Sequence, residues 1–268
     1  MSITLQEFID THTLKPREGL RVVTRHSETV VLRSDNEWLF YSSNAPTVCV
    51  EHLAILPADS EPEQFDDMLR WVPGKQQHQL HIKPVLPHLP VVVKPTRGIA
   101  IPGNSRAQFY TAIPMSLQLF INPAMPHSEP EPVYEMATEP LQQTWFGLNT
   151  REGEVCFASA DYLRLSPELL DVAAHHVLME LRVVNKESRT LRIDKLNIPV
   201  MYLPIYQLSN QQYWSPTVTI INERHSDALK LNYARTIGRK ADNPKLVGEA
   251  RLKSDSRTFF RALEAIIG

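Results

Sequence analysis

Ten histidines and two cysteines are the residues with which this chain could bind a metal ion or attack a substrate. His78 and His81 lie three residues apart in a segment with strand character, and His175 and His176 are adjacent. On a strand, both spacings place the two side chains on opposite faces, whereas a zinc site needs ligands that converge on one point. We therefore predict ordinary strand or surface histidines, and neither a bound metal ion nor a cofactor.

The other groups that could perform catalysis are a thiol and a pair of carboxylates. Apolar residues flank Cys156, which predicts a packed thiol and not an activated nucleophile. Glu152 and Glu154 have the spacing of a carboxylate pair, but on a hairpin we expect both to be solvated. The chain contains no Gly-x-Ser-x-Gly and no Gly-x-Gly-x-x-Gly motif. We predict no catalytic residue, and a hydrolase with an unfamiliar site is only the third hypothesis.

Aromatic side chains are the candidates for ligand binding. Trp145, Tyr206 and Trp214 could stack on a sugar ring or another small ligand if their rings are exposed. Packing in the core of a β-sandwich accounts for the same residues, so both interpretations stay open.

The clearest helical pattern lies at the C-terminus. Phe259, Leu263 and Ile266 recur at helical spacing, with Phe260 and Ile267 beside them. This amphipathic helix either packs on the protein's own sheet or is offered to a groove on a partner protein.

The elements that must position these residues are mostly strands. Residues 177–183 alternate between apolar and polar, residues 185–188 form a turn, and Leu191 and Ile193 resume the alternation. This pattern predicts an antiparallel hairpin over residues 177–193. Two segments depart from this strand pattern. The apolar residues of 65–72 have the spacing of a helix, and residues 237–254 show no periodicity.

Together these segments predict an all-β protein of antiparallel β-sandwich architecture. Proline is frequent (21) and glycine is sparse (9), which suits short strands joined by stiff connections. Prolines occur at residues 84, 87, 90 and 95. This stretch marks either a domain boundary or a stiff crossover inside one domain. We predict an N-terminal β unit over residues 1–85, a larger β-sandwich domain over 86–235, and an irregular tail over 236–268 that ends in the amphipathic helix.

Charge and hydropathy limit where the protein acts. A formal net charge of −2 gives no general attraction to nucleic acid. No window approaches the ~18 apolar residues of a membrane-spanning helix, and the first residues lack the pattern of a secretory signal. We expect a soluble cytoplasmic protein without membrane insertion.

Four motifs occur in a defined order: TWFG at residues 144–147, GEVC at 153–156, NIPVMYLPIY at 197–206 and YWSPTVT at 213–219. Over roughly residues 85–235 the chain resembles an uncharacterised prokaryotic family, the domain of unknown function 432. The resemblance implies a cytoplasmic β protein and transfers no catalytic residue. It also implies an association with small mechanosensitive channels, near whose genes such proteins tend to be encoded.

Two functions therefore compete. The first is a non-enzymatic binding or regulatory module that acts through protein–protein interaction, with a small mechanosensitive channel as the implied partner. The alternative is a module that binds a carbohydrate or another small ligand through Trp145, Tyr206 or Trp214. The oligomeric state stays open.

Overall fold

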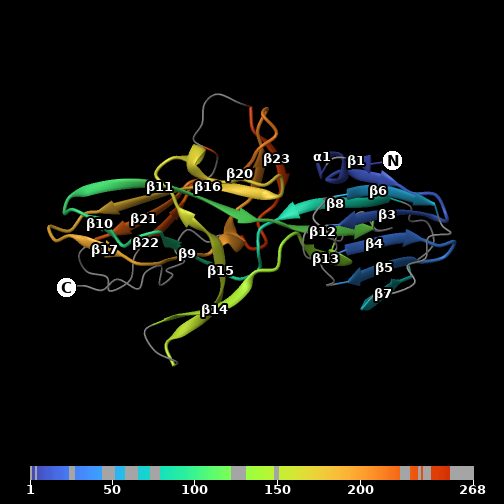
Figure 1. Cartoon of the computed structure of the whole chain (residues 1–268), viewed down its shortest axis with the longest axis horizontal. Coiled ribbons are helices and arrows are strands. Elements are labelled where there is room, and N and C mark those ends of the chain that lie inside the picture. The colour runs from blue at the N-terminus through green and yellow to red at the C-terminus, as the bar shows by residue number, and fades with distance from the viewer. Residues whose placement is uncertain are drawn as a thin grey trace. The chain divides into compact units, whose positions relative to one another are not determined.

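The computed structural model describes residues 2–3, 5–23, 28–43, 52–57, 66–72, 79–121, 131–147, 151–223, 230–234, 237 and 243–253. These residues are mostly strand, which confirms the all-β prediction (Figure 1). The chain divides into two compact units. The first comprises Met1–Pro84 and Ser116–Pro140, and the second comprises Val85–Met115 and Leu141–Gly268.

This division differs from the predicted one, because the segment Ser116–Pro140 returns to the first unit. Its strands are β12 (Ser116–Ile121) and β13 (Tyr134–Ala137). They lie in one sheet with β8 (Gln79–Val85) and β2 (Thr11–Thr13), in the order β13-β12-β8-β2. Alternation along a chain identifies strands but does not identify their neighbours, so this return was not visible in the local pattern.

The larger sheet of the first unit has the strand order β1-β6-β3-β4-β5-β7, and all of its pairings are antiparallel. Its strands are β1 (Ser2–Ile3), β3 (Glu18–Val23), β4 (Glu28–Arg33), β5 (Trp38–Ser43), β6 (His52–Pro57) and β7 (Asp67–Trp71). A short helix, α1 (Leu5–Phe8), follows β1. Phe40 of β5 stacks on Tyr134 of β13 with ring centroids 5.3 Å apart, so the two sheets of this unit share an aromatic contact.

Strand β7 corrects the helical interpretation of residues 65–72. Leu69 lies opposite Phe40 and Met68 lies opposite Tyr41 in an antiparallel pairing with β5. Pairing with a neighbouring strand therefore overrides the helical spacing of the apolar residues. Both Leu69 and Met68 are exposed, and β7 forms the last strand of its sheet.

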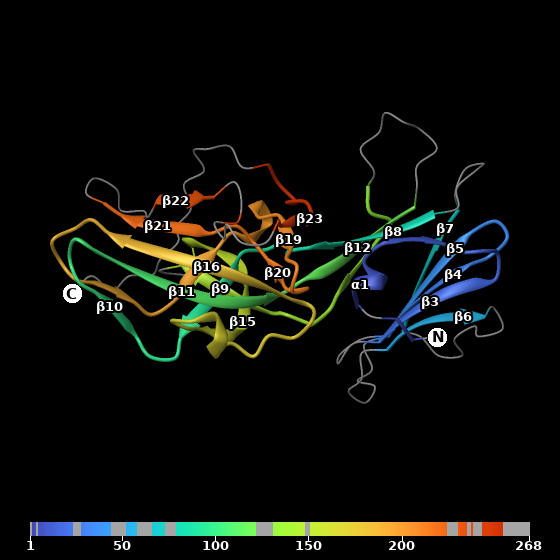
Figure 2. The same cartoon turned by 90° about the horizontal axis from the view of Figure 1, so that it is seen from above.

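The second unit is built around β16 (His176–Asn185), which belongs to a seven-stranded sheet (Figure 2). The sheet order is β22-β21-β16-β20-β19-β23, and β11 also pairs with β16. Its other strands are β11 (Ser105–Pro114), β19 (Ile205–Gln207), β20 (Tyr213–Trp214), β21 (Val218–Asn222), β22 (Lys230–Tyr233) and β23 (Lys245–Gly248). The predicted alternation is confirmed in β16, where Val183 is buried and Arg182 is exposed.

The predicted hairpin over residues 177–193 is wrong in its pairing. Strand β16 pairs antiparallel with β11 and parallel with β20 and β21. The next strand, β17 (Leu191–Ile193), instead pairs with β10 (Ile99–Ile101). A turn of suitable composition does not guarantee that the strands on either side of it pair, because strands distant in the sequence compete for the same edges.

The remaining sheet of the second unit has the order β14-β15-β9-β18. Its strands are β9 (Val91–Pro95), β14 (Gln142–Gly147), β15 (Gly153–Leu163) and β18 (Leu196–Ile198). Two single turns of 3-10 helix complete the unit, η1 (Pro167–Leu169) and η2 (Val200–Tyr202).

The C-terminal region has one strand where none was predicted. Strand β23 pairs with β19 inside the segment that lacked periodicity. The predicted amphipathic helix with Phe259, Phe260, Leu263, Ile266 and Ile267 lies outside the described residues. Among the residues that the structure describes, no helix has the length and apolar character needed to cross a membrane.

Asn185 joins several turns at one end of the second unit and is only 1% exposed. Its side-chain nitrogen donates to the backbone oxygens of Ile101, Pro102 and Arg189, at 3.1, 3.0 and 2.8 Å. Its side-chain oxygen accepts from the backbone nitrogen of Glu187 and the side-chain nitrogen of Asn222, at 3.2 and 3.0 Å. One buried amide therefore connects β10, the turn after β16, and β21.

Gly103 lies in the turn between β10 and β11, close to the turn that follows β16. A Cβ atom at residue 103 would lie 2.2 Å from the backbone oxygen of Ser188 and 2.8 Å from that of Glu187. The backbone nitrogen of Asn104 donates to the same Glu187 oxygen at 2.8 Å. The two turns are in backbone contact here, and only glycine leaves room for it.

Candidate functional site

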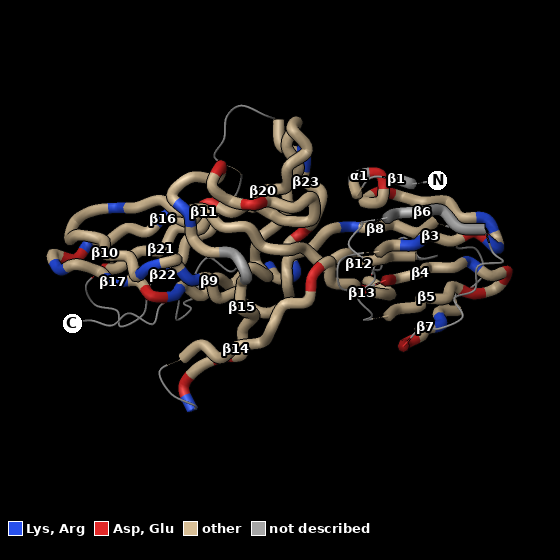
Figure 3. Tube along the Cα trace, in the orientation of Figure 1, with Lys and Arg blue, Asp and Glu red and all other residues tan. Residues whose placement is uncertain are grey.

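The hairpin of β14 and β15 presents apolar side chains to solvent. Trp145 of β14 lies opposite Val155 of β15 in the antiparallel register. The two residues are 42% and 44% exposed. Strand β14 contains no Lys, Arg, Asp or Glu (Figure 3), whereas Arg151 and Glu152 directly precede β15. The exposed face of this hairpin, Trp145 with Val155, is called the hairpin face below.

The opposite face of the same hairpin is part of the core. Phe146 and Cys156 are buried together with Val92 of β9. The ring of Trp145 is also held in place, since a Cβ atom at residue 153 would lie 2.7 Å from its Nε1 and Cε2 atoms. The glycine at residue 153 therefore lets the indole pack directly against the backbone of the neighbouring strand. A hairpin anchored on one side thus displays an aromatic ring on the other.

A polar group lies beneath the hairpin, on its inner face. Asn197 of β18 is fully buried, and its side-chain nitrogen donates to Oε1 of Glu154 at 2.7 Å. The thiol of Cys156 lies 3.7 Å from the side-chain oxygen of the same asparagine. We predicted that both glutamates are solvated. Glu152 is exposed, but Glu154 is half-buried. No sequence pattern marks Asn197 as a partner of Glu154, because the two side chains meet only after β15, β9 and β18 have paired.

The electrostatics of this group oppose nucleophilic catalysis. Burial, together with the carboxylate of Glu154, raises the pKa of the Cys156 thiol to about 12. A thiol with this pKa is almost entirely protonated at neutral pH, and the protonated form is a poor nucleophile. The predicted packing of Cys156 agrees with its burial.

Glu154 gives a prediction about pH dependence. Burial raises the pKa of its carboxyl above the ordinary value of 4.5, although the bond from Asn197 opposes this rise. Because the folded protein holds the proton more tightly than the unfolded chain, the stability contributed by Glu154 is lost as the pH rises above that ordinary value. Relative to Glu154→Gln, the wild type should therefore lose free energy of unfolding as the pH rises from below 4.5 through the raised pKa of Glu154.

Urea unfolding of both proteins across this range measures the effect. Glu152→Gln, at the exposed position two residues earlier, is the matched control. A wild type that gains stability relative to Glu154→Gln with rising pH would contradict the prediction.

The other two aromatic candidates lie elsewhere in the second unit. Trp214 is 3% exposed and packs with Ala112, Leu178 and Leu208. It therefore offers no open ring face to a ligand. Tyr206 is half-buried on β19. Tyr206 and Trp214 lie opposite each other in the pairing of β19 with β20, whereas Trp145 belongs to another sheet.

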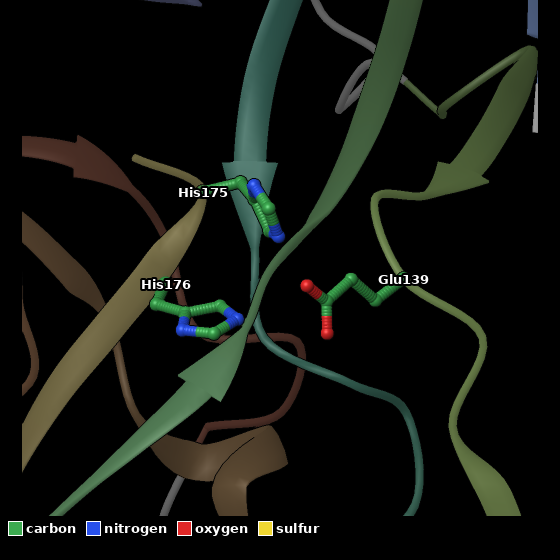
Figure 4. A group of neighbouring side chains, drawn as sticks. All are labelled: Glu139, His175 and His176. Carbon is green, nitrogen blue, oxygen red and sulfur yellow. The ribbon is translucent and has the colours of Figure 1, made fainter. Parts of the chain in front are cut away.

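Two histidines of the second unit approach each other. The rings of His175 and His176 have centroids 4.8 Å apart at an interplanar angle of 79° (Figure 4). Strand alternation predicts that the two side chains lie on opposite faces, but His175 belongs to the turn before β16, where this alternation does not apply. Glu139, also labelled in Figure 4, belongs to the first unit.

The second predicted pair of histidines is only partly described. His78 lies outside the described residues. Nδ1 of His81 is 2.8 Å from the hydroxyl oxygen of Thr11 on the neighbouring strand β2. Desolvation, followed by the charge of Lys83, lowers the pKa of His81.

A family model described as protein of unknown function (DUF432) matches residues 10–265. The chain belongs to the DUF432 family. The match extends beyond residues 85–235, where the resemblance was recognised, and includes most of the first unit. No curated protein and no solved structure matches this DUF432 protein.

Proposed function

We propose that this protein is a non-enzymatic binding or regulatory module that recognises another protein through its hairpin face. The observation that carries the proposal is the exposure of Trp145 beside Val155 on a hairpin whose inner face is core. Tryptophan is among the residues most often found at the energetic centre of protein interfaces.

The surroundings of Trp145 support protein recognition. Trp145 and Val155 provide an apolar centre, and the exposed Arg151 and Glu152 provide a polar border. Protein interfaces commonly combine a centre poor in charge with a polar rim. The indole is already packed against the backbone at residue 153, so binding would order little that is mobile.

The partner that we propose is a small mechanosensitive channel, on the basis of the family resemblance alone. The resemblance also motivates a prokaryotic cytoplasmic location. The paired sheets of each unit motivate the finer proposal of β-sandwich architecture. Only a part of the channel that is accessible from the cytoplasm could meet the hairpin face.

Trp145→Ala tests the proposed function. We expect wild-type protein to bind the purified channel of its own source organism, and Trp145→Ala to bind about 30-fold more weakly, as is typical for the loss of a central tryptophan. Biolayer interferometry with the channel immobilised in detergent measures both. Leu246→Ala, at an exposed apolar position on β23, is the matched control and should bind like the wild type.

The proposal fails in two distinguishable ways. If Trp145→Ala and wild type bind the channel equally, the hairpin face is not the binding surface. If the wild type does not bind the channel, the proposed partner is wrong.

A small-ligand function is the second candidate, and the exposed indole favours it. Aromatic rings held flat on a strand are suitable platforms for sugar rings. Of the three aromatic residues considered for this role, Trp145 has the most exposed position. Titration with mono- and disaccharides, followed by tryptophan fluorescence in wild type and Trp145→Ala, tests this candidate. Fluorescence changes that are equal in both proteins would exclude Trp145 as the platform.

A further inference from the structure

His175 and His176 are two residues of the second unit whose imidazole rings lie close together. The residues are only 5% and 9% exposed. One ring nitrogen of each lies within 4.8 Å of the other, and Figure 4 shows the two rings side by side. Two adjacent residues on a regular strand would point in opposite directions, so this arrangement depends on the turn that precedes β16.

Backbone hydrogen bonds fix that turn. The backbone nitrogen of His176 donates to the oxygen of Ala173 at 3.0 Å. The backbone oxygen of His175 accepts from the nitrogen of Met115 at 3.0 Å. Main-chain contacts within their own unit therefore position both histidines.

We propose that His175 and His176 bind one divalent transition-metal ion of the zinc class. Imidazole nitrogen is a preferred ligand of Zn²⁺, Ni²⁺ and Cu²⁺, and a poor ligand of Mg²⁺ and Ca²⁺. Tetrahedral coordination at about 2.0–2.1 Å requires the two nitrogens to be roughly 3.3 Å apart. The two ring nitrogens already lie within 4.8 Å of each other, so a small adjustment of the rings brings them to this separation. The two histidines occupy two coordination positions, and water or a further ligand takes the others.

A hydrogen bond to the His176 ring bears on which of its nitrogens binds the ion. The backbone nitrogen of Ala173 donates to Nδ1 of His176 at 3.4 Å. A neutral imidazole that accepts at Nδ1 carries its proton on Nε2. Binding of a metal ion at Nε2 moves the proton to Nδ1 and breaks this long hydrogen bond. The amide of Ala173 is therefore a reporter of metal binding.

Titration of the full chain without an affinity tag tests the proposal. Calorimetry with Zn²⁺ should show one equivalent bound, with affinity at least about tenfold weaker in His175→Gln and in His176→Gln because each removes one ligand. His88→Gln, an exposed histidine of the same unit, should bind like the wild type. Mg²⁺ should produce no heat of binding.

A second measurement covers the case in which a glutamine variant does not fold. In the wild type, NMR should show that Zn²⁺ shifts the amide of Ala173 and the ring resonances of both histidines at one equivalent. Unchanged resonances at these residues would overturn the proposal. So would equal Zn²⁺ affinity in the wild type and in a folded variant that lacks both histidines, since binding would then be adventitious.

Discussion

Replacing Asn185 with alanine is expected to lower the free energy of unfolding of the second unit by about 3–4 kcal/mol. The substitution removes a fully buried amide that donates to three backbone oxygens and accepts two further hydrogen bonds. Of those partners, Ile101 is buried and Glu187 and Asn222 are half-buried, so the substitution leaves groups with little access to water without the atoms that satisfied them. Leaving buried polar groups unsatisfied costs more than losing a hydrogen bond at the surface.

Urea unfolding followed by tryptophan fluorescence measures this loss. Asn210→Ala is the matched control, because Asn210 lies in an exposed turn and hydrogen-bonds to Gln212. Its replacement should change the free energy of unfolding by less than about 0.5 kcal/mol. Equal effects of the two substitutions would mean that Asn185 does not hold the turns together.

Gly103→Ala is expected to destabilise the second unit by about 2–4 kcal/mol. The added methyl group would lie 2.2 Å from the backbone oxygen of Ser188, and backbone cannot rotate away as a side chain can. The two turns must separate, which also stretches the bond from the Asn104 nitrogen to the Glu187 oxygen. We therefore expect a lower thermal midpoint and faster amide exchange at residue 104.

Gly98→Ala provides the comparison for Gly103→Ala. A Cβ atom at residue 98 would meet only a side-chain oxygen of Asp194, at 3.0 Å, and that side chain can rotate. Calorimetric scans should therefore show a small change for Gly98→Ala and a large one for Gly103→Ala. A thermal midpoint of Gly103→Ala within one degree of the wild type would show that the two turns are not in close contact.

The fold could be predicted from the sequence only where a feature depends on residues that are close together in the chain. Alternation between apolar and polar residues correctly identified β16, because one face of that strand is buried wherever it pairs. The same alternation could not show that β16 pairs with β11 and not with β17, since partner choice depends on residues far away in the chain. Helical spacing misled at β7, where pairing with β5 decides the conformation.

The candidate site was predictable in part for the same reason. The type and strand position of Trp145 could be recognised in the sequence, but its exposure depends on which face of β14 the core covers. Trp214 has the same chemistry and the opposite environment. The Glu154–Asn197 bond joins residues that are distant in sequence, so neither residue type nor spacing indicated it.

The discontinuity of the first unit bears on how the protein is made. Strand β8 has β2 and β12 as its neighbours in the sheet, and β12 lies after the first segment of the second unit. A nascent chain that has emerged only as far as Pro84 therefore lacks two of the four strands of that sheet. Although N-terminal domains generally fold first during synthesis, this one must wait for the ribosome to release residue 137. During that interval an unfinished sheet edge is open to chaperones, or to the same edge on a neighbouring nascent chain.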